Sequence, residues 1–240
     1  MNKINNVVHN IKKLLKSTGS VIKTKSWQGT ETPMNMIELL HPRLTIDMEH
    51  TEVKLLQMCD NPKIGWARDH FMERISGVPY NPAPSTLAWS PEAMDYTSKK
   101  DPSKFSHTYP ERYWYSKLVH HGYRYDTGDL NTLVNLLKKE PDTRQAVLPM
   151  FIFEDMTAAL EGERVPCSLS WNFIIRDGKL DCTYTMRSCD AVRHLLNDIY
   201  FANMLSMYIL ERIDKDNVVL GQLRMNITSL HCFEKDLIDV

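Results

Sequence analysis

The pattern of apolar and polar positions divides the chain into helix-like and strand-like segments. Apolar residues recur at helical spacing over residues 1–16, with asparagine and lysine between them, which predicts an amphipathic surface helix rather than a signal peptide. Helices are also expected over residues 64–75, closing at Gly77, and over residues 131–139. Residues 190–213 are apolar on nearly every side, so we expect a buried, central helix there.

Strand-like segments alternate with these helices. Residues 34–40 form one expected strand, which ends at the turn His41-Pro42-Arg43. Residues 146–153 are a nearly continuous apolar run, which is typical of a strand covered on both faces. Residues 218–233 are expected to return as one or two further strands.

The strongest local signal is a β-hairpin. Residues 168–175 and 180–186 are apolar-rich, and Asp177-Gly178 lies in the turn between them. Strands interleaved with helices, one of them buried, predict an α/β or α+β fold. No shift in composition marks a linker, so we expect a single domain over residues 1–240, with a long loop at about 78–110.

Composition excludes several classes of function. The net charge of -1 gives no field for non-specific binding to nucleic acid or to an anionic membrane, and no apolar run approaches a membrane span. An odd number of cysteines without CxxC spacing argues against a disulfide framework and a zinc site, and it suits a reducing cytoplasm. The five are Cys59, Cys167, Cys182, Cys189 and Cys232.

Cys167, which opens the hairpin after Pro166, is either apolar filler or a nucleophile. The hairpin brings it near Arg187, whose charge is expected to lower the pKa of the thiol and favour the thiolate. Arg187 and Ser188 also offer a guanidinium fork and a hydroxyl suited to a phosphate. The alternative for Arg187 is a structural ion pair with Asp190.

Asp198 is a carboxylate inside the apolar helix. It follows Asn197 and is flanked by leucine, isoleucine and aromatic residues. Either the helix end is solvated there, or the carboxylate is buried and recognises a ligand, because an unpartnered buried charge is costly.

These residues carry a resemblance. "VPCSLSWNFIIRDGKLDCTYTMRSCDAVRHLLNDIYFANML" resembles the active-site half of the thymidylate synthase superfamily. Asp198 stands where uracil-specific members have asparagine, and both the Asn-Asp pair and Ser229-Leu230-His231 resemble phage-type deoxycytidylate hydroxymethylases. The chemistry agrees, since an ionised carboxylate accepts the amino hydrogen of cytosine, favours a protonated ring nitrogen and repels the carbonyl of uracil.

The resemblance implies roles for individual residues. Cys167 would attack C6 of the pyrimidine and make C5 nucleophilic, while Asp198 and Asn197 would face the base. Arg187 and Ser188 would hold the 5′-phosphate. Further residues have implied roles at the second substrate or its water (Asp190), the sugar hydroxyl (Ser229, His231) and the pocket lining (Tyr109, Trp114).

The resemblance also implies a quaternary structure. It suggests a large mixed sheet covered by helices on one face and dimerised through the other. Arg144 would reach across a homodimer to the partner's phosphate, although Gln145 replaces the second arginine of the family pair.

Three departures from the family pattern concern the folate side. The position of the family's general-acid glutamate falls at His70, so Asp69 or Glu73 would have to substitute for it. His194 replaces a glycine near the folate. The chain stops soon after Phe233, which stands where a sugar-binding tyrosine is expected, so the tail that closes over the folate is expected to be missing.

The expected function is therefore C5 modification of dCMP through a Cys167 adduct. Hydroxymethylation with 5,10-methylene-tetrahydrofolate is the family default. Direct hydroxylation by an oxidant without folate, methylation, and a nucleotide-binding paralogue without catalysis are the alternatives. The resemblance also suggests a role in making modified phage DNA in a host cytoplasm.

Overall fold

The predicted Asp177-Gly178 hairpin forms the middle of a mixed sheet. The computed structural model describes residues 3–24, 34–58, 63–89, 97–114 and 129–237. In it, β5 (Ser168–Arg176) and β6 (Lys179–Asp190) pair antiparallel. Asp177 and Gly178 have φ values of 50° and 69°, the left-handed angles that a two-residue hairpin turn requires. The hairpin prediction is confirmed.

Seven strands of the described chain form this sheet, and the longest of them pairs with three others. β7 (Val219–Phe233) runs parallel to β6. Along its other edge it pairs antiparallel with β2 (Met34–Leu40) and β3 (Arg43–Asp47), which are joined by the predicted turn at His41. β1 (Ser20–Thr24) pairs with β2, and β4 (Val147–Pro149) pairs with β5.

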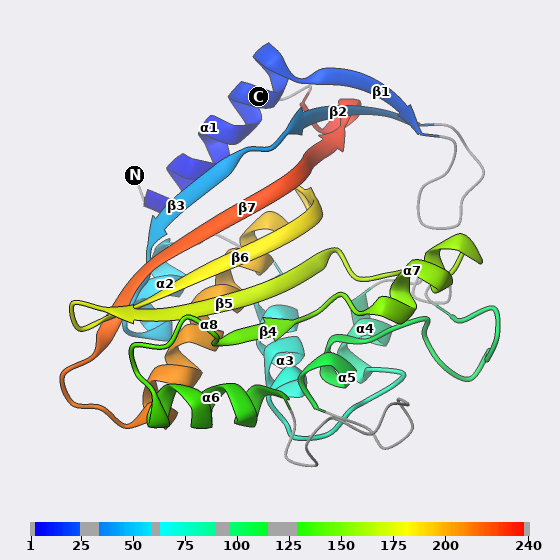
Figure 1. The fold of residues 1–240 in the computed structure, drawn as a ribbon. Helices are drawn as coiled ribbons and strands as arrows, with labels where there is room; N and C mark the ends of the chain where they lie inside the picture. Colours follow the sequence, from blue (N-terminus) through cyan, green and yellow to red (C-terminus); the bar gives the residue numbers. More distant parts are fainter. Residues whose placement is uncertain (1–2, 25–33, 59–62, 90–96, 115–128, 238–240) are drawn as a thin grey trace.

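Helices gather on one face of the sheet. Figure 1 shows α8 (Leu195–Ile213) behind the strands, with α2 (Glu52–Met58), α3 (Ile64–Arg74) and α6 (Asp129–Lys139) around it. Thirteen of the 19 residues of α8 are buried, which confirms the predicted central helix. Side chains from β5 and β6 that point toward this layer, such as Trp171 and Tyr184, have no exposed surface.

The remaining helices are short or peripheral. α1 (Lys3–Thr18) buries Ile4, Ile11 and Leu15 against the core and leaves Leu14 exposed, as expected for an amphipathic surface helix. The 78–110 segment is less loop-like than predicted, because it contains α4 (Pro84–Trp89) and the start of α5 (Tyr109–Tyr113). None of the described helices is both long and apolar enough to span a bilayer.

The prediction for residues 146–153 was wrong. Only Val147–Pro149 form a strand, which pairs with β5 alone, and Phe153 begins α7 (Phe153–Leu160) with 84% of its surface exposed. Pro149 has no backbone N–H to donate, so it is suited to a short edge strand and not to the centre of a sheet.

The prediction that a helix starts at residue 190 was also wrong. Asp190 ends β6, and its carboxylate accepts hydrogen bonds from the backbone N–H groups of Val192 and Arg193 at 2.9 Å each. These bonds stabilise a turn, so α8 begins only at Leu195.

Candidate active site

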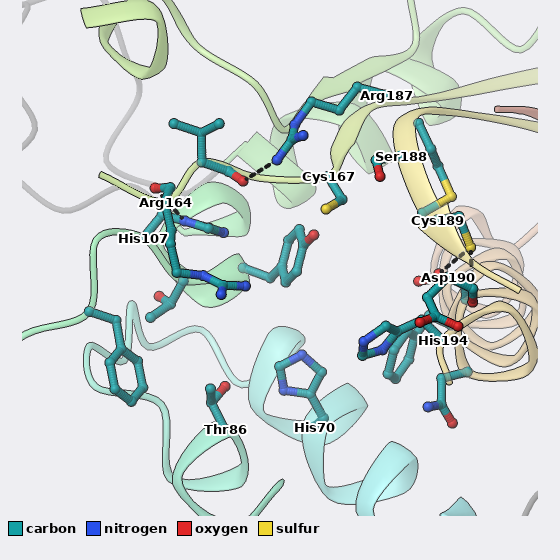
Figure 2. A pocket seen from close by; sticks show the side chains of 18 of the residues that line it. His70, Thr86, His107, Arg164, Cys167, Arg187, Ser188, Cys189, Asp190 and His194 are labelled. Carbon is teal, nitrogen blue, oxygen red and sulfur yellow. Dashed lines mark hydrogen bonds between the residues drawn. The ribbon is translucent and has the colours of Figure 1, made fainter. Parts of the chain in front are cut away.

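A cavity of about 510 Å³ lies where β5, β6 and β7 meet the helices α3 and α8. Most of the residues singled out in the sequence line it. They are Tyr109, Cys167, Arg187, Ser188, Asp190, Asn197, Asp198 and His231. Figure 2 shows Cys167, Arg187 and Ser188 on the opposite side of this cavity from His70.

We call the side formed by Cys167, Arg187, Ser188, Asp190 and His231 the strand wall. Backbone hydrogen bonds hold the residues of this wall in place. The Arg187 N–H donates to the carbonyl oxygen of Cys167 at 2.9 Å, and the parallel register of β6 and β7 places Asp190 opposite His231. Ser188 Oγ lies 3.5 Å from His231 Nδ1. Hydrogen-bonded backbones therefore hold the thiol, the guanidinium and the hydroxyl close together.

Arg187 supports the segment that carries the thiol. Its Nε and Nη2 donate to the carbonyl oxygens of Pro166 and Val165 at 2.8 and 2.9 Å, and the latter bond is drawn in Figure 2. Arg187 does not pair with Asp190, whose ion-pair partner is Arg193 at 3.2 Å. The alternative of an Arg187–Asp190 ion pair is therefore wrong.

Cys167 is partly accessible from the cavity, whereas Cys182, Cys189 and Cys232 are buried. The expectation of a lowered thiol pKa was wrong. Burial raises the pKa of Cys167 above its ordinary value, and the nearby Arg187 and Arg164 charges oppose this rise only in part. The thiol is therefore protonated in the unliganded protein at neutral pH.

We call the cavity residues that α3 and α8 contribute, Trp66, His70, Arg74, Asp198 and Phe201, the helix wall. Asp198 is 9% exposed, and burial raises its pKa to about 7, against the opposing influence of Arg74 and a hydrogen bond from the Cys189 thiol at 3.5 Å. The solvated-helix-end alternative for Asp198 is wrong. A carboxyl group with this pKa can either give or take a proton near neutral pH.

His70 occupies the position at which the sequence predicts a general acid. Its Nε2 accepts a hydrogen bond from Arg74 Nη2 at 2.9 Å, and its Nδ1 lies 2.6 Å from Ser85 Oγ. Burial, assisted by the Arg74 charge, lowers the pKa of His70 to about 4. His70 is therefore neutral at pH 7, with its proton on Nδ1 so that Nε2 can accept.

Neither proposed substitute for the glutamate lines the cavity. Glu73 turns toward α4, where it accepts hydrogen bonds from the Ser85 N–H at 2.6 Å and from the Ser85 hydroxyl. Burial would raise the pKa of Glu73, but hydrogen bonds from His70 and Ser85 outweigh it and lower the pKa. Asp69 is exposed on α3. The structure thus does not bring either carboxylate to Cys167.

Three other predicted residues also lie outside the cavity lining. Ser229 donates to Glu38 on β2. Trp114 packs in the core, where its Nε1 donates to the Arg74 carbonyl oxygen at 2.6 Å. Arg144 is exposed just before β4, outside the cavity of its own chain.

Several cavity residues were missed in the sequence. Arg164 and His107 are both labelled in Figure 2, and the His107 Nδ1–H donates to the Arg164 carbonyl oxygen at 3.1 Å. Burial lowers the pKa of His107 to about 3, with Arg112, Arg164 and Arg187 acting in the same direction. The sequence signal that could have identified Arg164 as a cavity residue is its position three residues before Cys167.

The described residues contain no group of three or more His, Cys, Asp or Glu side chains arranged to hold a metal ion. The fold and the cavity define a mixed α/β protein with a thiol, arginines and a buried carboxyl group in one site.

Comparisons with known proteins identify the family. Residues 88–240, well over half of the chain, match the family model described as "Thymidylate synthase", so the chain belongs to the thymidylate synthase family. Members are methyltransferase-type transferases that modify C5 of a pyrimidine nucleotide with methylene-tetrahydrofolate.

One matching solved structure is the thermostable thymidylate synthase A from Bacillus subtilis. The match has a TM-score of 0.69 and 14% sequence identity, and it covers 95% of this chain and 79% of that one. At this identity the match shows the shared fold. No curated protein matches the sequence of this chain.

Proposed function

We propose that this protein modifies C5 of dCMP through a covalent bond between Cys167 and C6 of the base. One observation carries the proposal: Cys167, Arg187, Ser188 and Asp198 line a single cavity. The cavity lining thus includes both a thiol and an acid with a pKa of about 7. A pyrimidine nucleotide uses both walls at once, since its phosphate suits the strand wall and its ring suits the helix wall.

The phosphate would bind at the mouth of the cavity. The Arg187 guanidinium and the Ser188 hydroxyl provide charge-assisted and neutral hydrogen bonds, and Arg164 adds a second positive charge on the same side. His231 would contact the sugar hydroxyl, while Asn197 and Asp198 would face the base. Asp190, which is tied to Arg193, would order the second substrate or its water.

The reaction would begin with attack of the Cys167 thiolate on C6. The S–C6 bond forms, and the electrons of the C5–C6 double bond move toward C5 and the ring nitrogen N3. C5 would then bond to the one-carbon unit that methylene-tetrahydrofolate supplies; tetrahydrofolate would leave, and water would provide the oxygen of the hydroxyl group. Loss of the C5 hydrogen as a proton and departure of the thiolate restore the ring. Arg187 and Arg164 would stabilise the thiolate in both directions.

Asp198 would act as an acid toward the base. Its protonated form offers an O–H to N3 of cytosine and a carbonyl oxygen to the amino group. A proton at N3 makes C6 more electrophilic, and an acid with a pKa of about 7 is well matched to this transfer. The proposal of cytosine over uracil rests on this carboxyl group.

Methylene-tetrahydrofolate would supply a one-carbon unit at the oxidation level of formaldehyde. The lining fits such a group in part: Trp66 and Phe201 contribute aromatic surface for a pterin ring, and His70 and Arg74 already cover one face of each. His194 also lines the cavity and takes up space there. The product proposed is 5-hydroxymethyl-dCMP.

A homodimer is part of the proposal. Figure 1 shows the strand face opposite the helices with none of the labelled helices in front of it. Arg144 is exposed and therefore available to a second protomer's phosphate site. A place in the making of modified phage DNA in a host cytoplasm is proposed from the resemblance alone.

Mass spectrometry of dCMP incubated with the protein tests the function. A hydroxymethyl product that needs methylene-tetrahydrofolate supports the proposal, and a Cys167→Ala variant is the control. An added oxygen atom without folate would favour direct hydroxylation instead, which is suggested by the absence of Glu73 from the cavity. Bound but unchanged dCMP would favour a non-catalytic paralogue.

A further inference from the structure

The Asp198 carboxyl group is held by one of its two oxygens. Its Oδ2 accepts a hydrogen bond from the Cys189 thiol at 3.5 Å. No other described residue forms a hydrogen bond or an ion pair with this carboxyl group. Oδ1 has no partner in the described part of the chain, and it is not one of the fully buried polar atoms there that lack one. Oδ1 is therefore the oxygen that is left to meet a ligand in the cavity.

Cys189 is a buried thiol that keeps its proton near neutral pH. It lies on β6, is 3% exposed and lines the cavity. Burial, and next the Asp198 charge, raise the pKa of this thiol well above its ordinary value. Its sulfur lies 3.7 Å from the Asp190 carbonyl oxygen and 3.5 Å from Asp198 Oδ2, and Figure 2 shows dashed lines at the labelled Cys189. Since sulfur is a weak acceptor, the thiol serves as a donor at this position.

Other charged or titratable groups near Asp198 do not replace this thiol. They come from α3, α5, β6 and the residue before β5, and each acts on Asp198 or responds to its charge: Arg74, Tyr109, Tyr184 and Cys167. Within the described chain none of them donates a hydrogen bond to the carboxyl group. Cys189 is therefore the group that can distinguish one carboxyl oxygen from the other.

A neutral carboxyl group does not by itself distinguish cytosine from uracil. With the proton on the oxygen that faces N3, it offers a donor to N3 and an acceptor to the 4-amino group, which suits cytosine. With the proton on the other oxygen, it offers a donor to the 4-carbonyl and an acceptor to the N3–H, which suits uracil. Discrimination between the bases therefore requires a neighbouring group that fixes which oxygen carries the proton.

We infer that Cys189 is a specificity-determining residue: by donating to Oδ2, its thiol keeps the carboxyl proton of Asp198 on Oδ1, where N3 of cytosine would meet it. A proton on Oδ2 would point at the thiol and would have only a weak sulfur acceptor as its partner. Oδ2 would accept from the amino group of the base as well as from the thiol. The identity of the base rests on the proposed function, whereas the position of the proton does not depend on a nucleotide.

Calorimetric titrations with dCMP and dUMP at pH 6 test this inference, because most of Asp198 is protonated there. Cys189→Ala should lower the ratio of dCMP affinity to dUMP affinity about three- to tenfold, the range that one neutral hydrogen bond supplies. Cys189→Ser restores a donor, so its ratio should fall less. Cys182→Ala is the matched control and should keep the wild-type ratio, because Cys182 is a buried cysteine of the same strand that does not line the cavity. An unchanged ratio in Cys189→Ala, or an equal loss in Cys189→Ser, would overturn the inference.

A second measurement needs no nucleotide. Carbon NMR of the aspartate carboxyl groups in the unliganded protein should show a higher Asp198 pKa in Cys189→Ala, because a hydrogen bond that stabilises the carboxylate is lost. An unchanged Asp198 pKa would contradict the inference. If neither nucleotide binds, the proposed function fails, and this NMR titration alone decides whether the thiol holds the carboxyl group.

Circular dichroism checks that the variants fold. If Cys189→Ala does not fold, Cys189→Val and Cys189→Thr form a second pair. Both fill the space and suit a β-strand, and they differ by one hydroxyl donor. Cys189→Val should then lower the affinity ratio more than Cys189→Thr, and equal ratios would overturn the inference.

Discussion

The strand wall and the helix wall of the cavity are built in different ways. Cys167 directly precedes β5 and Arg187 lies on β6, and the hydrogen bond from the Arg187 N–H to the Cys167 carbonyl oxygen fixes their positions. On the helix wall, His70 belongs to α3 and Asp198 to α8, and ring contacts of Trp66 and His70 with Phe201 join these helices. The strand wall carries the exposed Arg187. On the helix wall, burial shifts the pKa values of His70 and Asp198 so that the neutral form of each is favoured. Binding is therefore expected to depend on the first wall and proton transfer on the second.

Replacing Cys167 should have the largest effect. If the thiol adds reversibly to C6, C5 becomes basic and its hydrogen exchanges with solvent, so dCMP should take up deuterium at C5 in heavy water. Cys167→Ser should slow this exchange at least about a thousandfold. NMR or mass spectrometry measures the exchange without any second substrate. Cys182 lies on the same hairpin but is buried and does not line the cavity, so Cys182→Ser should catalyse the exchange at the wild-type rate. Exchange at the wild-type rate in Cys167→Ser would remove the nucleophile from the mechanism.

Replacing Arg187 tests whether the strand wall is a phosphate site. Arg187→Gln should weaken dCMP binding by roughly ten- to a hundredfold, because a hydrogen bond to a charged group contributes about 1.5–3 kcal/mol. Deoxycytidine, which has no phosphate, should bind both forms about equally. Equal losses for the two ligands would instead assign Arg187 to holding the Val165–Pro166 backbone.

Replacing Asp198 tests the helix wall as the reader of the base. Asp198→Asn always presents an amide donor, which suits the carbonyl of uracil, so the ratio of dCMP to dUMP affinity should fall by about tenfold. In the wild type, dCMP affinity should fall as pH rises through about 7, because the ionised carboxylate cannot donate to N3. The variant should lack this pH dependence. An unchanged preference would show that other groups recognise the base.

The same carboxyl group should be visible in the stability of the unliganded protein. Its pKa is about 7 when folded and near ~4 when unfolded, so the folded state binds the extra proton between these values. The Asp198 contribution to the free energy of unfolding therefore falls as pH rises from 4 to 7 and is constant above 7. In urea titrations, the difference between Asp198→Asn and the wild type should grow in favour of the variant between pH 5 and pH 7.5. A constant difference would contradict the raised pKa.

The sequence predicted the parts of the fold that local rules determine. The Asp177-Gly178 turn and the buried α8 follow from turn chemistry and hydrophobic pattern, whereas residues 218–233, expected as one or two strands, form the single strand β7. The prediction of a buried strand over residues 146–153 failed. An apolar run alone does not distinguish such a strand from a short edge strand followed by a helix with an exposed Phe153.

In the candidate site, too, the residues that local rules place could be predicted, and those that depend on tertiary packing could not. Cys167, Arg187 and Ser188 could be grouped from the hairpin alone, since register follows from the turn. Arg74 could not, because an arginine at the end of a helix is ordinarily solvated, and its burial depends on Tyr109 and Phe201 closing over it from distant parts of the chain. The raised pKa of Cys167 was missed for a related reason: its burial depends on tertiary packing, and only the arginine was evident in the sequence.

Arg164 should give the smallest effect and the finest test of how the strand wall binds phosphate. Arg164 places a positive charge near Cys167 from within the same chain. Arg164→Gln should therefore weaken dCMP binding only severalfold, less than Arg187→Gln, and should raise the pKa of the Cys167 thiol, since one of the charges opposing its rise is removed. The pH dependence of iodoacetamide labelling at Cys167 measures that pKa. A weaker nucleotide affinity with an unchanged labelling profile would mean that Arg164 contacts the phosphate but lies too far from the thiolate to stabilise it.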